Sequence, residues 1–219
     1  MLLLIHGGGW QGLNPVALQT EEKVSVVFRQ NGYATLAVDY RRGAQGVKDV
    51  EGFYRMARQR VGPAVPICAL GVSAGGQIAL MLAVRYSDLA CVVDFAGPTD
   101  LSALKRDPGG SKGYQLVTAA FARDQLGEFS PALQAHSIKA KLLLIYAQND
   151  PLVPIAQGRE MARADPRADL VVLPPGSATF VHTGVGAPIS ATGVSASAKA
   201  QAQLAEGRLL ESVARAGPS

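Results

Sequence analysis

Short apolar runs rich in β-branched residues alternate with longer amphipathic stretches along most of the chain. Each run is apolar on successive residues, which is typical of a strand buried on both faces of a parallel sheet. The expected strands are Leu2 to Ile5, Ala34 to Asp39, Ile67 to Val72, Ala90 to Phe95, Leu142 to Tyr146 and Leu170 to Leu173. The expected helices are Pro15 to Gln30, Gln45 to Arg60, Gly75 to Tyr86, Ile155 to Ala164 and Ala196 to Ala214. This alternation predicts an α/β fold with a doubly wound, mainly parallel sheet and flanking helices.

Composition excludes several classes of protein. With 48% apolar and 17% charged residues in a chain of 219, one globular domain over residues 1–219 is expected, not a disordered chain. The net charge of +4 comes from scattered residues without a basic run, so we expect no nucleic-acid partner. No apolar stretch approaches the length of a membrane span, and Met1 to Ile5 is too short for a secretory signal. The chain is therefore expected to be cytoplasmic, with no membrane partner.

Two further features concern the cysteines and one long connection. Cys68 and Cys91 lie in apolar segments interpreted as neighbouring strands, and we expect buried thiols there, not a disulfide or a catalytic group. The segment Leu101 to Gln134 is longer than a simple crossover needs, and it contains DPGGSKG and, near its end, SP. It predicts a cap or lid inserted at about residues 101–134.

The motif that carries chemistry is GVSAGG, which places Ser73 in G-x-S-x-G between a buried strand and a helix. In this nucleophile elbow the turn is so sharp that only small residues fit two positions on either side of the serine, here Gly71 and Gly75. The serine hydroxyl then projects above the sheet. The position of the motif, more than its five residues alone, favours Ser73 as a nucleophile.

The glycines of HGGGW follow the first strand, and they fit the same chemistry. A serine that attacks an acyl carbon generates an oxyanion, which needs backbone N–H donors placed in advance. One donor is expected from Ala74, which follows the nucleophile, and the second from the glycine loop. Gly8, together with Gly9, is the candidate for that second donor.

The serine needs a base and an orienting acid. Of three histidines, His6 belongs to the glycine loop and His136 precedes a strand, away from the carboxyl ends where such sites form. His182 is therefore the candidate base. Asp150 follows a strand in QNDPLVP and gives the order Ser73, Asp150, His182 that an α/β-hydrolase shows.

Two rival acids remain, Asp94 and Asp100, close to the end of VVDFAG. Asp150 is preferred because Asp94 lies inside an apolar run and because Asp-Pro-Leu-Val-Pro makes a rigid loop.

The segments HGGGW, VDYR, GVSAGG, DFAGPTDL, SPALQAH and LLLIYAQNDPLVP resemble the α/β-hydrolase esterases of the hormone-sensitive-lipase-like branch and its relatives, the feruloyl and acetyl-xylan esterases. The resemblance covers nearly the whole chain. It implies a carboxylic ester hydrolase with Ser73, His182 and Asp150 as its triad, Gly8, Gly9 and Ala74 around the oxyanion, and no metal or organic cofactor. The hormone-sensitive-lipase-like branch usually carries an acidic residue directly before the serine, where this chain has Val72. This difference favours assignment to the relatives of that branch.

The glycine loop of this family normally follows the third strand, whereas here it follows the first, so two strands are expected to be missing. A sheet that begins at Leu2 to Ile5 would leave an edge that must be covered or paired, and we therefore expect self-association into a homo-oligomer.

The expected partner is a small-molecule ester with a short acyl chain. Tyr114, Phe121 and Phe129 of the possible cap would supply a modest apolar acyl pocket. Two alternatives stay open: an amide or formamide hydrolase or peptidase with the same triad, and a non-catalytic binding protein on a hydrolase scaffold.

Overall fold

The computed structural model describes residues 1–177 and 181–182. Six strands form one parallel sheet: β1 (Leu2–Ile5), β2 (Thr35–Val38), β3 (Cys68–Val72), β4 (Cys91–Phe95), β5 (Lys141–Ala147) and β6 (Asp169–Leu173). Their order is β2-β1-β3-β4-β5-β6, and every neighbouring pair is parallel. The chain therefore builds outward in both directions from β1 and β3. The predicted doubly wound sheet is confirmed.

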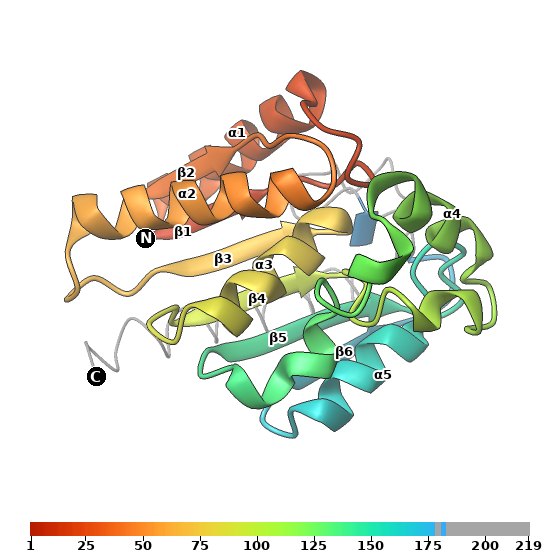
Figure 1. Cartoon of the computed structure of the whole chain (residues 1–219). Helices are drawn as coiled ribbons and strands as arrows, with labels where there is room; N and C mark the ends of the chain where they lie inside the picture. Colours follow the sequence, from red (N-terminus) through yellow and green to blue (C-terminus); the bar gives the residue numbers. More distant parts are fainter. Residues whose placement is uncertain (178–180, 183–219) are drawn as a thin grey trace.

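Helices cover both faces of this sheet. The α-helices are α1 (Pro15–Gln30), α2 (Ala44–Val61), α3 (Ala74–Arg85), α4 (Ser111–Ala120) and α5 (Ile155–Ala164). In Figure 1, α2 and α3 lie in front of the sheet and α1 lies behind it. Strands β1, β3 and β4 are completely buried; α1 and α3 both contact β1, and α3 contacts β3 and β4. The helix expected over Ala196 to Ala214 lies outside the described residues.

The connection after β4 carries α4 and three short 3-10 helices, η1 (Ala103–Lys105), η2 (Arg123–Gln125) and η3 (Pro131–Ser137). Figure 1 shows α4 beyond the carboxyl ends of the strands. A Cβ on Gly9 would lie 3.3 Å from Leu116 of α4, and one on Gly43 would collide with the carbonyl oxygen of Ala120. The segment is thus packed against the glycine loop. Its role as a cap stays a prediction.

The expectation of free cysteines is wrong. Cys68 and Cys91 form a disulfide with a Cα–Cα distance of 4.6 Å. They are the first residues of β3 and β4 and lie directly opposite each other in the register. The sequence placed the two residues on neighbouring strands but did not predict their register, on which the bond depends. Disulfides are typical of oxidising compartments, and the cytoplasmic location stays a prediction.

Leu2 to Ile5 is not at the edge of the sheet, because β1 pairs with β2 on one side and β3 on the other. The edge on that side is β2, the second strand along the chain. None of the described helices is both long and apolar enough to cross a membrane.

Candidate active site

Ser73 lies between β3 and α3 in a turn that demands unusual backbone angles. Its φ of 54° and ψ of −118° belong to a region that residues other than glycine rarely adopt. A Cβ on Gly71 would lie 2.1 Å from the carbonyl oxygen of Gly75, and one on Gly75 2.1 Å from that of Ile5. The N–H of Ser73 donates to the carbonyl oxygen of Phe95 at 2.7 Å, which ties the turn to β4. This is the geometry expected of the G-x-S-x-G turn.

The glycine loop lies beside this turn. A Cβ on Gly7 would lie 3.4 Å from the Cβ of Ser73. Gly8 and Gly9 have φ values of 122° and 62°, which L-residues with side chains strongly disfavour. Within the part of the chain that the structure describes, the N–H groups of Gly8 and Gly9 donate to no acceptor. They are thus available to an incoming group, as is expected of oxyanion donors, and Ala74 begins α3 next to Ser73.

His6 holds the base of this loop. Its Nδ1 lies 2.6 Å from the carbonyl oxygen of Gly7, and its Nε2 lies 2.9 Å from Oδ1 of Asp39. The ring is almost completely buried and stacks on Tyr40 with 4.4 Å between centroids. Both ring nitrogens therefore have partners, which agrees with a structural role for His6.

Asp150 and His182 come together at the carboxyl ends of β5 and β6. Oδ1 of Asp150 accepts from the N–H groups of Leu152 (2.8 Å) and Val153 (3.0 Å), so the loop holds its own carboxylate rigidly. Oδ2 lies 2.8 Å from Nε2 of His182. The two atoms are close enough for an ion pair, but the angles between the groups are not those of a hydrogen bond.

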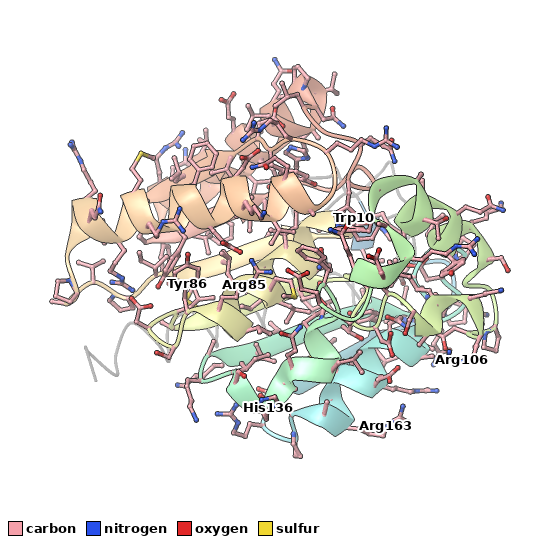
Figure 2. The ribbon with its side chains drawn as sticks, in the orientation of Figure 1. Trp10, Arg85, Tyr86, Arg106, His136 and Arg163 are labelled. Carbon is pink, nitrogen blue, oxygen red and sulfur yellow. A yellow bond between two sulfur atoms is a disulfide. The ribbon has the colours of Figure 1, made fainter. Side chains whose placement is uncertain are left out.

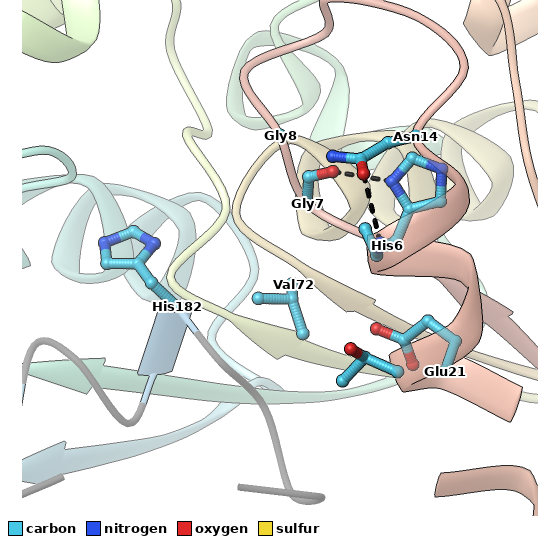
Figure 3. Close-up of a pocket in the computed structure, with 9 residues that line it drawn as sticks. His6, Gly7, Gly8, Asn14, Glu21, Val72 and His182 are labelled. Carbon is cyan, nitrogen blue, oxygen red and sulfur yellow. Dashed lines mark hydrogen bonds between the residues drawn. The ribbon is translucent and has the colours of Figure 1, made fainter. Parts of the chain in front are cut away.

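His182 reaches the same cavity as the glycine loop. That cavity is lined by His182, Gly8 and Val72, the residue before Ser73. In Figure 3, Val72 lies between His182 on one side and His6 and Glu21 on the other. No hydrogen bond joins Ser73 to His182 in the described ranges.

The rival candidates have other partners. Asp94 is completely buried and accepts from the hydroxyl of Tyr146 at 2.7 Å. Burial raises its pKa to about 7, against the effect of that hydrogen bond. Asp100 accepts from the backbone N–H and the hydroxyl of Ser102 and so stabilises its own turn. His136 lies in η3, exposed, and Figure 2 shows it far from Trp10 of the glycine loop.

One supporting residue was not predicted. Gln77 of α3 is fully buried, its Oε1 accepts from Nε1 of Trp10 at 2.9 Å, and its Nε2 donates to the carbonyl oxygen of Phe129 at 2.7 Å. It links the elbow helix to the glycine loop and to the connection after β4. Phe121 and Phe129 pack against each other and Phe121 against Trp10, all buried, instead of lining the cavity beside His182.

A second residue escaped prediction. Glu21 lies on the buried side of α1 with Val24, Ser25 and Phe28. Its position at helical spacing on an otherwise enclosed face was the sequence signal that could have identified it.

The described residues include no group of three or more His, Cys, Asp or Glu side chains placed to hold a metal ion. The fold and the elbow together define an α/β-hydrolase. Within this class, the chain belongs to the BD-FAE family, whose model matches residues 1–164. The match contains Ser73, Asp150 and the glycine loop, whereas His182 lies beyond it. Among curated proteins, none matches the chain.

Solved structures share the fold at low sequence identity. A truncated carbohydrate esterase from gut microbiota has a TM-score of 0.72 at 16% identity, over 95% of this chain and 85% of its own. An esterase/lipase from an uncultured bacterium has a TM-score of 0.70 at 17% identity, over 97% and 76%.

A puromycin-hydrolysing peptidase from Mycobacterium tuberculosis has a TM-score of 0.63 at 18% identity. The match covers 84% of this chain but only 31% of the peptidase. The family match confirms the resemblance to the α/β-hydrolase esterases that was found in the sequence, and these solved structures share the fold.

Proposed function

We propose that the chain hydrolyses short-chain carboxylic esters through an acyl-enzyme on Ser73. The observation that carries this proposal is the joint placement of Ser73 beside the glycine loop and of His182 at 2.8 Å from the buried carboxylate of Asp150. A serine hydroxyl is a weak nucleophile, and a histidine paired with an acid is the arrangement that activates it.

In the first half of the reaction, His182 accepts the proton of the Ser73 hydroxyl while Oγ forms a bond to the ester carbon. The N–H groups of Ala74 and Gly8 bind the oxyanion. The bond to the alkoxy group then breaks, and the alcohol leaves with the proton from His182. Asp150 stabilises the imidazolium between these two transfers.

Water completes the cycle. It gives a proton to His182 as its oxygen attacks the acyl carbon, and the tetrahedral intermediate again needs the two N–H donors. The bond between the acyl carbon and Oγ breaks, Ser73 recovers its proton from His182, and the carboxylic acid is released.

Replacement of Ser73 tests the nucleophile. Ser73→Ala is expected to lower kcat on p-nitrophenyl acetate by about a thousandfold or more, because the remaining groups cannot form the acyl-enzyme. A fluorophosphonate probe should label the wild-type chain at Ser73, as mass spectrometry of the labelled peptide would show. Ser87→Ala, an exposed serine after the far end of α3, is the control and should keep normal activity. Substantial turnover by Ser73→Ala would refute the proposal.

The base is tested by two histidine substitutions made in parallel. His182→Ala should lower kcat about as severely as loss of the nucleophile, because the triad acts as a unit. His136→Ala should have little effect, since His136 is exposed in η3. Circular dichroism would establish that both variants fold. A near-normal rate for His182→Ala, with a loss for His136→Ala, would reverse the assignment.

Amide hydrolysis is the second candidate, favoured by the likeness to the puromycin-hydrolysing peptidase over 84% of this chain. Esters and amides differ in the leaving group, which the same triad can protonate. A panel of p-nitrophenyl esters of increasing chain length, run beside anilide and formamide analogues, separates these reactions. Higher kcat/KM on the anilides would favour the amidase. Turnover of none of them by folded protein would favour a binding protein.

A further inference from the structure

A cavity of about 240 Å³ lies between α1, the glycine loop and His182. Its lining residues are His6, Gly7, Gly8, Asn14, Ala17, Thr20, Glu21, Val72 and His182. The cavity thus adjoins both the proposed base and a proposed oxyanion donor. Its volume suits one small substituent, not a long acyl chain.

Glu21 is the unusual member of this lining. It is only 5% exposed, and Figure 3 shows its carboxyl group pointing from α1 toward Val72. Within the described ranges it forms no ion pair and no hydrogen bond. Burial of a carboxyl group without a partner is unfavourable. The packing of α1 against the sheet does not by itself explain why a carboxyl group stands at this position. Burial also raises its pKa to about 7.

The titratable groups around Glu21 are already engaged. His6 on β1 contacts Gly7 and Asp39 through its two ring nitrogens. The hydroxyl of Tyr40, after β2, donates to the carbonyl oxygen of His6. His182, across the cavity, faces Asp150. None of these groups neutralises Glu21 by direct contact.

Two more polar groups line the same wall. Oδ1 of Asn14 accepts from the N–H of Ala17, whereas its Nδ2 has no acceptor in the part of the chain that is described. The hydroxyl of Thr20 donates to the carbonyl oxygen of Val16, which leaves its lone pairs free to accept. Glu21, Asn14 and Thr20 therefore offer the cavity both a donor and acceptors.

We propose that this cavity is a subsite for a hydroxyl-bearing substituent of the ester, with Glu21 as the residue that selects it. The proposal rests on the proposed esterase function and narrows its substrate class. A hydroxyl group both donates and accepts, so it can pair with the carboxyl group of Glu21 whether that group is ionised or protonated. An ammonium group can only donate, so it would have no hydrogen bond to accept from a protonated Glu21, and an alkyl group would leave the carboxyl group unpaired.

The hydroxyl group could belong to the alcohol or to the acyl part of the ester. Both parts adjoin His182 and the glycine loop during the proposed reaction. Two matched substrate pairs separate these sources. Glyceryl acetate and propyl acetate differ by hydroxyls on the alcohol, and ethyl 3-hydroxybutyrate and ethyl butyrate differ by a hydroxyl on the acyl chain.

The experiment compares kcat/KM on these pairs for wild type, Glu21→Gln and Glu22→Gln. Wild type should prefer the hydroxylated member of one pair, and Glu21→Gln should lose about tenfold of that preference, as expected when a site loses one strong hydrogen bond to a substrate hydroxyl. Glu22 is the matched control because it follows Glu21 on α1 but is exposed. Its substitution should leave the preference intact. The pair that responds identifies the source of the hydroxyl.

A second variant covers the case in which Glu21→Gln does not fold. Ala17→Leu fills the cavity from the same helix and keeps the carboxyl group, and it should lower kcat/KM for the hydroxylated ester more than for its partner. Equal kcat/KM on both members of both pairs by wild type would overturn the proposal. So would an unchanged preference in folded Glu21→Gln.

Failure of the esterase function would look different. Binding of glyceryl acetate and propyl acetate to the Ser73→Ala variant, measured by calorimetry, does not depend on turnover. Tighter binding of glyceryl acetate, lost on adding Glu21→Gln, would support the subsite even if wild type hydrolysed no ester. Equal binding of the two esters in an enzyme that hydrolyses propyl acetate would overturn the subsite alone.

Discussion

At the scale of single residues, Glu21 links the proposed selectivity to stability. Its pKa rises from an ordinary value of 4.5 to about 7 because burial disfavours the charged form. Between these two values the folded chain holds a proton that the unfolded chain releases. The contribution of Glu21 is therefore most favourable below the lower value and is lost as the pH rises through about 7.

Glu21→Gln should consequently gain stability relative to wild type as the pH increases. The difference in the free energy of unfolding should grow by up to about 3 kcal/mol between pH 5 and pH 8 and level off above that. Urea unfolding at several pH values measures it, with Glu22→Gln as the control. Asp94 titrates over the same range in both proteins, so its effect cancels in the comparison. Parallel pH profiles for wild type and Glu21→Gln would contradict a perturbed Glu21.

At the scale of elements, the Cys68–Cys91 disulfide joins the strand that ends in the nucleophile to its neighbour. The bridge lies at the amino ends of β3 and β4, opposite the end that carries Ser73. It spans 23 residues of sequence, including the elbow and the whole of α3. A cross-link over such a loop restricts the unfolded chain.

Removal of the bridge should therefore lower stability more than it lowers activity. The double variant Cys68→Ala with Cys91→Ala is expected to lose about 3 kcal/mol of unfolding free energy, as the chain-entropy estimate gives for a loop of this length. Urea unfolding of wild type with and without reductant provides the matched comparison, because it leaves the side chains in place. An identical midpoint for oxidised and reduced protein would show that the bridge contributes nothing.

The elements also show what the sequence could and could not predict. Continuous apolar runs predicted all six strands, because a strand buried on both faces needs no knowledge of its neighbours. Likewise, the elbow around Ser73 was predicted because its glycines and its serine are adjacent in the chain. The Cys68–Cys91 bond depends on register, which arises only when β3 and β4 pair.

The cavity was harder to foresee for the same reason. Glu21, Val72 and His182 lie on three segments far apart in the sequence, and only the packing of α1 beside the sheet brings them together. The partners of Gln77 are similarly distant in the chain. The assignments to Ser73, Asp150 and His182 stay predictions until the substitutions above are made.

At the scale of the whole molecule, the sheet has an edge at β2. This strand pairs only with β1 in the part of the chain that is described, and Leu2 donates from its N–H to the carbonyl oxygen of Ala34. The alternation of a parallel pair then directs the N–H groups of Thr35 and Ala37 away from β1. On α1, which packs against β2, Val26 and Val27 are 43% and 52% exposed. An unpaired edge beside exposed apolar side chains favours association with a second copy.

Self-association therefore stays a prediction, now placed at β2 instead of β1. Light scattering from about 1 to 100 μM should show a mass that rises toward twice the 22.8 kDa of the chain. Ala37→Pro removes an outward N–H without touching the β1 pairing, so it should weaken association while circular dichroism and esterase activity report an intact fold. Edge pairing uses backbone hydrogen bonds and apolar contacts. Added salt should therefore not dissociate the dimer, as it would dissociate a dimer held by ion pairs. A wild-type monomer throughout this range would show that β2 is not an association edge.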